Sequence, residues 1–135
     1  MDNTAYQQLY RSDKSLYTPS SPLVIVAFAL LRSNRTGQAI AQVKFRNISE
    51  TTIHGVYAAV ECWDANGAPL KGLHEVLYND LYAEEGEAFG QNFAVHLPDN
   101  ATRKIAVTVH KVQYEYDLWE APARAVWEAN ALPEF

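Results

Sequence analysis

The sequence has little cysteine, little methionine and no cluster of positive charge, and each shortage excludes a class of protein. Cys62 is the single cysteine in 135 residues, so the chain cannot form an intramolecular disulfide or belong to the small disulfide-held secreted proteins. The single methionine is Met1, so a blue-copper site has no axial methionine late in the chain. The 11 Lys and Arg residues are scattered, and the formal net charge is −5. Without a basic stripe, we expect no nucleic-acid partner.

Targeting and membrane-spanning segments are also missing from the sequence as given. The longest apolar run, residues 22–31, is far too short to cross a bilayer. The first residues have neither a basic start nor an apolar core, so they are not a signal peptide. We therefore expect no membrane contact within this chain and, if the chain is complete, a cytoplasmic location.

Motifs for catalysis and cofactor binding are absent as well. No two histidines have the short spacing of a zinc or copper motif, and no Gly-x-Ser-x-Gly nucleophile elbow occurs; the histidines are His54, His74, His96 and His110. Cys62 alternates in phase with Val56 and Val60, which places its thiol in a core, where a raised pKa makes it unreactive. The sequence therefore predicts no metal, no cofactor and no enzyme.

Short strands dominate the body of the chain. Apolar and polar residues alternate with a period of two, and turn signals separate the runs at the spacing of an all-β sandwich. About six strands are predicted, at residues 22–31, 38–48, 52–64, 72–82, 88–97 and 102–117. We expect a phase slip near His110 and a bulge at Gly55. Between the strands no helical pattern of ten residues occurs, which disfavours an α/β fold.

The two ends of the chain read differently from the body. Residues 1–21 form a predicted N-terminal extension, in which Tyr6 and Tyr10 would lie one turn apart on a short helix. Residues 22–118 form the predicted β-sandwich domain. Residues 119–135 form a predicted C-terminal helical segment, with Trp119 and Trp127 on one face.

Residues 43–70 show how the strands are joined. Asn47 and Ser49 are predicted to form one turn, and Asp64 and Gly67 the next. Between these turns, one parity of each strand is apolar. The predicted core residues here are Val43, Phe45, Val56, Val60 and Cys62.

Over residues 22–119 the chain resembles the immunoglobulin-like β-sandwich domains of uncharacterised bacterial proteins. The resemblance is carried by a strand that ends in Phe-x-Asn-x-Ser, a Thr-Ile start to the next strand, an Asp-x-x-Gly turn and a Gly-Glu turn before a late strand. It implies an immunoglobulin-like antiparallel sandwich of bacterial origin. It implies no catalytic residues, because these motifs are turn and core residues.

Aromatic residues provide the candidate contact surface. Tyr57 and Trp63 fall on the polar parity of their strand, where they would form an exposed platform of the kind that stacks sugars. The alternative is that the terminal segments, with Tyr6, Tyr10, Trp119 and Trp127, fold back and cover that face.

Three functions follow from this sequence. The first is a non-catalytic protein-interaction or structural module that contacts a partner, or a second copy, through a sheet edge, the aromatic face or the C-terminal segment. The predicted partner-binding residues are Tyr57, Trp63, Trp119 and Trp127. The second function is a carbohydrate-binding module that uses Tyr57 and Trp63. The third is a small hydrolase without a recognisable motif.

Overall fold

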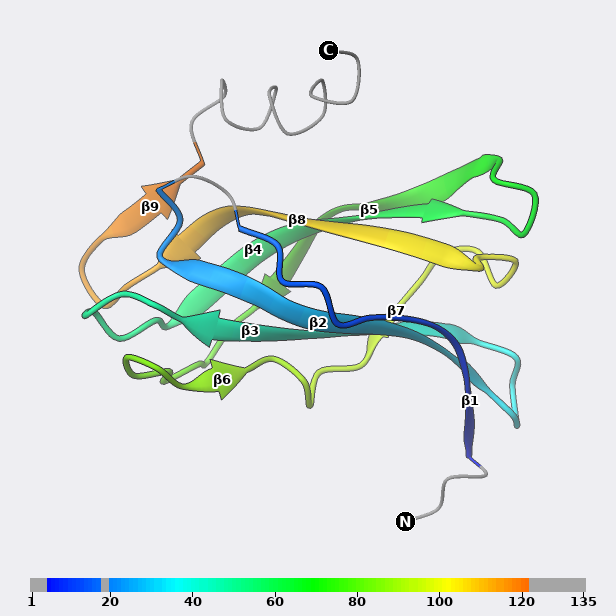
Figure 1. Cartoon of the computed structure of the whole chain (residues 1–135), viewed down its shortest axis with the longest axis horizontal. Helices are drawn as coiled ribbons and strands as arrows, with labels where there is room; N and C mark the ends of the chain where they lie inside the picture. The colour runs from blue at the N-terminus through cyan, green and yellow to red at the C-terminus, as the bar shows by residue number, and fades with distance from the viewer. Residues whose placement is uncertain (1–4, 18–19, 122–135) are drawn as a thin grey trace.

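The computed structural model describes residues 5–17 and 20–121, and every regular element in that part of the chain is a β-strand (Figure 1). The strands are β1 (Tyr6–Ser12), β2 (Leu23–Ser33), β3 (Ala39–Asn47), β4 (Gly55–Trp63), β5 (Pro69–Tyr78), β6 (Ala88–Phe89), β7 (Val95–His96), β8 (Lys104–Gln113) and β9 (Leu118–Glu120). In the described residues, no helix has the length and apolar character needed to cross a membrane.

The strands form two antiparallel sheets. In the first sheet the order is β1-β2-β3-β6, and β7 also pairs with β3. In the second sheet the order is β5-β4-β8-β9. Figure 1 shows β2 and β3 in one layer and β4, β5 and β8 in the other. The predicted all-β sandwich is confirmed at this level.

The core lies between the inner faces of the two sheets. The predicted core residues are all buried: Val43, Phe45 and Val56 are completely inaccessible, and Val60 and Cys62 nearly so. Alternation explains this result, since successive side chains of a strand point to opposite faces. The predicted turns are also confirmed, because Ser49 N–H donates to the Asn47 side chain and Asn66 N–H to the Asp64 carboxylate.

The prediction of a short N-terminal helix is wrong. Tyr6 and Tyr10 lie in β1, which pairs with β2 from Tyr6↔Ser33 to Ser12↔Phe28. The outer edge of β2 offers hydrogen bonds along its whole length, and this tertiary pairing overrides the weak local preference for a helix. Tyr10 packs against Phe28, with ring centroids 6.1 Å apart.

The predicted strand at 88–97 is interrupted at Gly90. Gly90 has φ +91°, and a Cβ there would lie 2.7 Å from Cδ2 of Phe45. Only glycine fits this left-handed position against the core. After β6 the chain therefore separates from β3 and makes a turn in which Phe93 N–H donates to the Gly90 carbonyl. It then pairs with β3 again as β7.

The last predicted strand ends early, because the chain turns after β8 and returns as β9. Trp119 therefore lies in a strand, so the helix predicted from residue 119 is wrong at its start; residues 122–135 lie outside the described part. The phase slip near His110 is confirmed, since Tyr57 pairs with Lys111 but Ala58 pairs with Val109. Gly55 begins β4 and is not the bulge.

Candidate functional site

The predicted aromatic platform is not continuous. Tyr57 and Trp63 both lie on the outer face of β4, and both are half-buried. They are six residues apart, which at 3.3 Å per residue separates them by about 20 Å along the strand. Ala59 and Glu61 stand between them on the same face. Tyr57 and Trp63 therefore cannot stack on one small ring together.

The surroundings of these aromatic residues also differ from one another. The Lys111 ammonium lies 5.7 Å from the centroid of the Tyr57 ring, a cation–π contact. Trp119 pairs with the buried Val112 and packs against the core, so it belongs to the inner face. Trp127 lies outside the described residues. The structure therefore does not bring the predicted partner-binding residues into one site.

The N-terminal segment does not cover this outer face. β1 joins the first sheet beside β2, whereas Tyr57 and Trp63 belong to the second sheet. The alternative in which Tyr6 and Tyr10 fold over Tyr57 and Trp63 is therefore wrong.

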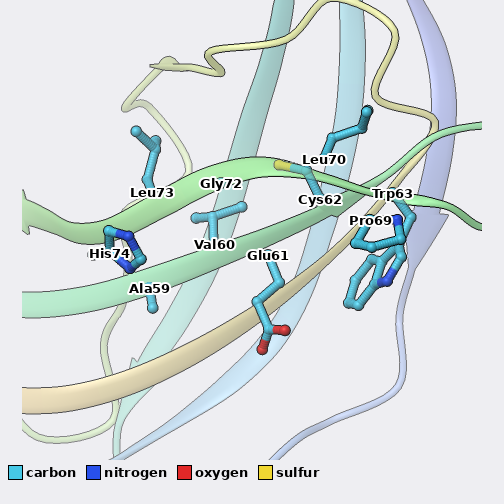
Figure 2. Close-up of a pocket in the computed structure, with 10 residues that line it drawn as sticks. All are labelled: Ala59, Val60, Glu61, Cys62, Trp63, Pro69, Leu70, Gly72, Leu73 and His74. Carbon is cyan, nitrogen blue, oxygen red and sulfur yellow. The ribbon is translucent and has the colours of Figure 1, made fainter.

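A hollow of about 220 Å³ lies beside Trp63, between β4 and β5 (Figure 2). Trp63 pairs directly with Pro69, and the two side chains lie together at one end of the hollow. Glu61 and His74, both exposed, are its polar lining residues. This arrangement offers one indole, one carboxylate and one imidazole to a small ligand.

The shape of this hollow depends on two bulges in β5. Val60 pairs with Leu73 but Cys62 pairs with Leu70, so β5 carries an extra residue there, and a second register shift follows between Ala58 and Val60. Gly72 occupies the first bulge, where a Cβ would collide with the Val60 carbonyl oxygen. Glycine is required at this position because the two backbones approach too closely for a side chain.

Cys62 lines the inner side of the same region, and its environment disfavours the thiolate. Desolvation raises the pKa of the thiol, a hydrogen bond with Thr102 lowers it, and the negative charge of Asp99 raises it. Cys62 is 2% exposed. Among the described residues, no group of three His, Cys, Asp or Glu side chains is arranged to hold a metal ion.

The outer edge of β8 is a feature that the strand pattern alone did not identify. β9 pairs with β8 only over Lys111–Gln113, and Ala121 N–H extends this pairing by one bond to the His110 carbonyl. At the other end, Arg103 N–H donates to the Trp63 carbonyl of β4. Val112 bonds β9, so Lys111 and Gln113 face β4, and the register shift at His110 passes this role to Thr108 and Ala106, which pair with Ala59 and Glu61. The backbone groups of Ile105, Val107 and Val109 therefore face away from β4, and no described strand pairs with them.

An apolar groove of about 290 Å³ runs beside this open edge. Leu16, Leu23 and Ile25 line it from the first sheet, and Val107 and Val109 line it from β8. Tyr17 is 54% exposed and also lines the groove, together with Ser21, Glu61, Ala106 and Thr108. The open edge and the groove together form a surface that we call the β8 cleft.

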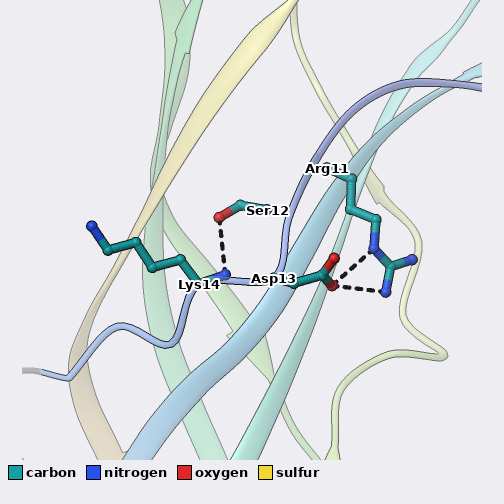
Figure 3. Close-up of polar contacts among 4 residues, drawn as sticks. All are labelled: Arg11, Ser12, Asp13 and Lys14. Carbon is teal, nitrogen blue, oxygen red and sulfur yellow. Dashed lines mark hydrogen bonds and ion pairs between the residues drawn. The ribbon is translucent and has the colours of Figure 1, made fainter.

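The segment after β1 forms the far wall of the β8 cleft. Figure 3 shows its start, where Arg11 pairs with Asp13 at 2.9 Å and Lys14 N–H donates to the Ser12 hydroxyl. Both members of the ion pair are more than half exposed, so the pair orients the turn more than it stabilises it. The chain then reaches Leu16, which exchanges two backbone hydrogen bonds with Ile25.

The other sheet edges in the described residues carry features that discourage pairing. β5 contains two register shifts, β1 contains one, and β6 and β7 have two residues each. Bulges and very short strands are the usual protection of an edge. Residues 105–109 of β8, Ile-Ala-Val-Thr-Val, have no charge, proline or glycine.

Comparison with known proteins identifies no relative: no family model, no curated protein and no solved structure matches this chain.

Proposed function

We propose that this chain is a non-catalytic interaction module that binds an extended segment of a protein partner along the open edge of β8. The single observation that carries the proposal is the β8 cleft, where unpaired backbone groups adjoin an apolar groove. Strand addition uses these two components: main-chain hydrogen bonds give affinity, and pockets for alternate side chains give selectivity.

The proposal includes an immunoglobulin-like topology. The chain crosses between the sheets three times, from β3 to β4, from β5 to β6 and from β7 to β8. One sheet then holds β5-β4-β8-β9 and the other holds β2-β3 with β6 and β7, in an arrangement that resembles the two-sheet Greek key of immunoglobulin-like domains. β1 is an addition at the edge of the first sheet.

The chemistry of the β8 cleft supports binding more than catalysis. Glu61 is the only carboxylate among its lining residues, and the remainder are apolar or carry a hydroxyl group. Hydrolysis of a glycoside by carboxylates needs two of them, one on each side of the bond that is cleaved, and the β8 cleft offers one. An extended peptide needs only backbone partners and apolar contacts.

Fluorescently labelled peptides of alternating Thr and Val, ended by Lys for solubility, test the proposal. We expect fluorescence anisotropy to rise on titration with the full chain, and to rise much less with Val107→Pro and with Tyr17→Asp. Proline at Val107 removes an N–H that faces the open edge, so the sheet loses no backbone bond of its own. Tyr17 is exposed, so Tyr17→Asp changes the groove without changing the core. Equal binding by the parent and both variants would contradict the proposal, provided that their circular dichroism agrees.

A second candidate function is binding of a single sugar ring in the hollow beside Trp63. The observation that favours it is the combination of an indole wall with Glu61 and His74. Sugar rings stack on aromatic side chains, and sugar hydroxyl groups donate hydrogen bonds to carboxylates. Titration with mono- and oligosaccharides should quench tryptophan fluorescence in the parent and not in Trp63→Phe. A flat titration across a broad glycan panel removes this candidate.

A further inference from the structure

Glu61 joins the β8 cleft to the outer face of the second sheet. It pairs with Ala106 of β8, and it lines the groove together with Ala106 and Thr108. Figure 2 shows its carboxylate extending from β4 toward the ribbon of β8. The side chain directly between Glu61 and the open edge is the methyl group of Ala106, which is too short to cover an exposed carboxylate. A long side chain that enters from the edge can therefore reach Glu61.

The Glu61 carboxylate has no charged partner of its own. It makes no hydrogen bond or ion pair with another described residue, and the one ion pair in that part of the chain joins Arg11 and Asp13. Lys104 lies on the same face of the sheet, but it pairs with Trp63, two residues along β4 from Glu61. The carboxylate is thus available to a cation that a partner brings.

An extended segment on the open edge would present its side chains in two rows. Residues opposite Val107 and Val109 would exchange backbone bonds with them and turn their side chains inward, toward the apolar groove. The residue opposite Ala106 would turn its side chain to the outer face, where Glu61 lies. Its Cα would lie about 10 Å from that of Glu61, across the two strand pairs that meet at Ala106. A lysine or arginine side chain and the Glu61 side chain together span this distance.

We propose that the β8 cleft selects extended segments that carry a lysine or arginine opposite Ala106, between two apolar residues, and that Glu61 determines this selectivity. This inference rests on the proposed strand-binding function and names the chemistry of its partner. The ion pair would be exposed, so it changes the affinity by about fivefold at most. Backbone bonds and the groove supply the rest of the affinity, and the charge selects among strands that fit.

Three matched peptides test the inference. Each alternates Thr and Val symmetrically about a central position, which is Thr, Arg or Glu, and all carry the same Lys ends. Fluorescence anisotropy with the parent chain should rank them Arg, Thr, Glu from tightest to weakest, with about fivefold between neighbours. Glu61→Gln should remove the advantage of the Arg peptide over the Thr peptide. Glu61→Lys should reverse the order of the Arg and Glu peptides, because the charge at this position is then inverted.

Glu75→Gln and Glu75→Lys are the matched controls. Glu75 is an exposed carboxylate on the neighbouring strand β5, and it lines neither the hollow beside Trp63 nor the β8 cleft. These controls are needed because a chain of net charge −5 attracts a basic peptide without any specific contact. Both should rank the peptides as the parent does. An Arg advantage that survives in Glu61→Lys overturns the inference, and so does one that Glu75→Lys reduces equally.

The same titrations separate this inference from the proposed function. If the parent binds all three peptides equally and Val107→Pro weakens them all, the selectivity is wrong and the interaction module stands. If the Arg advantage depends on Glu61 but Val107→Pro leaves every affinity unchanged, the peptides bind without strand addition, and both proposals are wrong. A parent chain that binds none of the peptides contradicts both as well. Circular dichroism of each variant should match that of the parent, since Glu61 and Glu75 are exposed.

Discussion

Replacement of Asn47 should destabilise the fold more than any other single polar change in the described residues. Asn47 is completely buried at the end of β3. Its Nδ2 group donates to the carbonyl oxygens of Thr51 and Ala83, each at 2.9 Å. Its Oδ1 accepts from the backbone N–H and the hydroxyl of Ser49, at 2.9 and 2.7 Å. One side chain thus ties the turn after β3 to the loop before β6.

The magnitude follows from what each partner loses in Asn47→Ala. Four hydrogen bonds at about 1 kcal/mol each set an upper value of about 4 kcal/mol. The two carbonyls keep other donors, since Ala83 still accepts from Ile53 N–H and Thr51 from the Ser49 hydroxyl. The Ser49 N–H keeps none. We therefore expect a loss of about 3 kcal/mol in the free energy of unfolding.

Urea denaturation followed by circular dichroism and tryptophan fluorescence measures this loss. Ser49→Ala is the control, because it removes only the hydroxyl bonds and should cost about 1 kcal/mol. Asn47→Asp adds a test of the chemistry: its carboxylate would face two carbonyl oxygens, so folding raises its pKa. Its stability relative to the parent should recover as pH falls toward the ordinary Asp pKa of about 4. A loss below about 1 kcal/mol in Asn47→Ala would refute the reasoning.

The remaining predictions concern Tyr78, Gly72 and Cys62. The Tyr78 hydroxyl is buried without a partner among the described residues, so Tyr78→Phe should raise the unfolding free energy by about 1 kcal/mol in urea titrations. Burial raises the pKa of Tyr78 to about 12, so the parent should lose stability as pH rises above about 10, and Tyr78→Phe should lose less. Gly72→Ala should shift or unfold β5, and hydrogen exchange in β5 should then be faster than in Gly55→Ala, whose Cβ would come no closer than 3.4 Å to a neighbouring atom. The Cys62 thiol should react with a disulfide reagent only at the rate of unfolding, so a fast reaction in native buffer would contradict its burial.

The core was predictable from the sequence because its signal is local. Val43, Phe45, Val56, Val60 and Cys62 alternate with polar residues, and alternation alone assigns a face. Turns such as Asn47–Ser49 were predictable for the same reason, since the side chain bonds backbone groups two residues away.

Pairing partners were not predictable, because they depend on residues distant in the sequence. β1 became a strand through its contact with β2, and the break at Gly90 reflects the close approach of Phe45. Tyr57 and Trp63 shared a face as predicted, but parity says nothing of their spacing along it. The β8 cleft had one local signal, the uncharged run at 105–109, and this run reads equally well as a central strand.

The two components of the β8 cleft must act together if it binds at all. An added strand gains up to six backbone bonds, from the N–H and C=O groups of Ile105, Val107 and Val109, worth about 6 kcal/mol in total. Association costs at least about 4 kcal/mol in lost rigid-body freedom, so the backbone bonds alone leave a surplus of about 2 kcal/mol at most, which is a dissociation constant weaker than about 1 mM. Tighter binding has to come from apolar surface, at about 25 cal/mol per Å² removed from water. Leu16 and Tyr17 provide that surface. Tyr17→Asp should therefore weaken peptide binding as much as Val107→Pro, although Tyr17 lies outside the sheet that receives the strand.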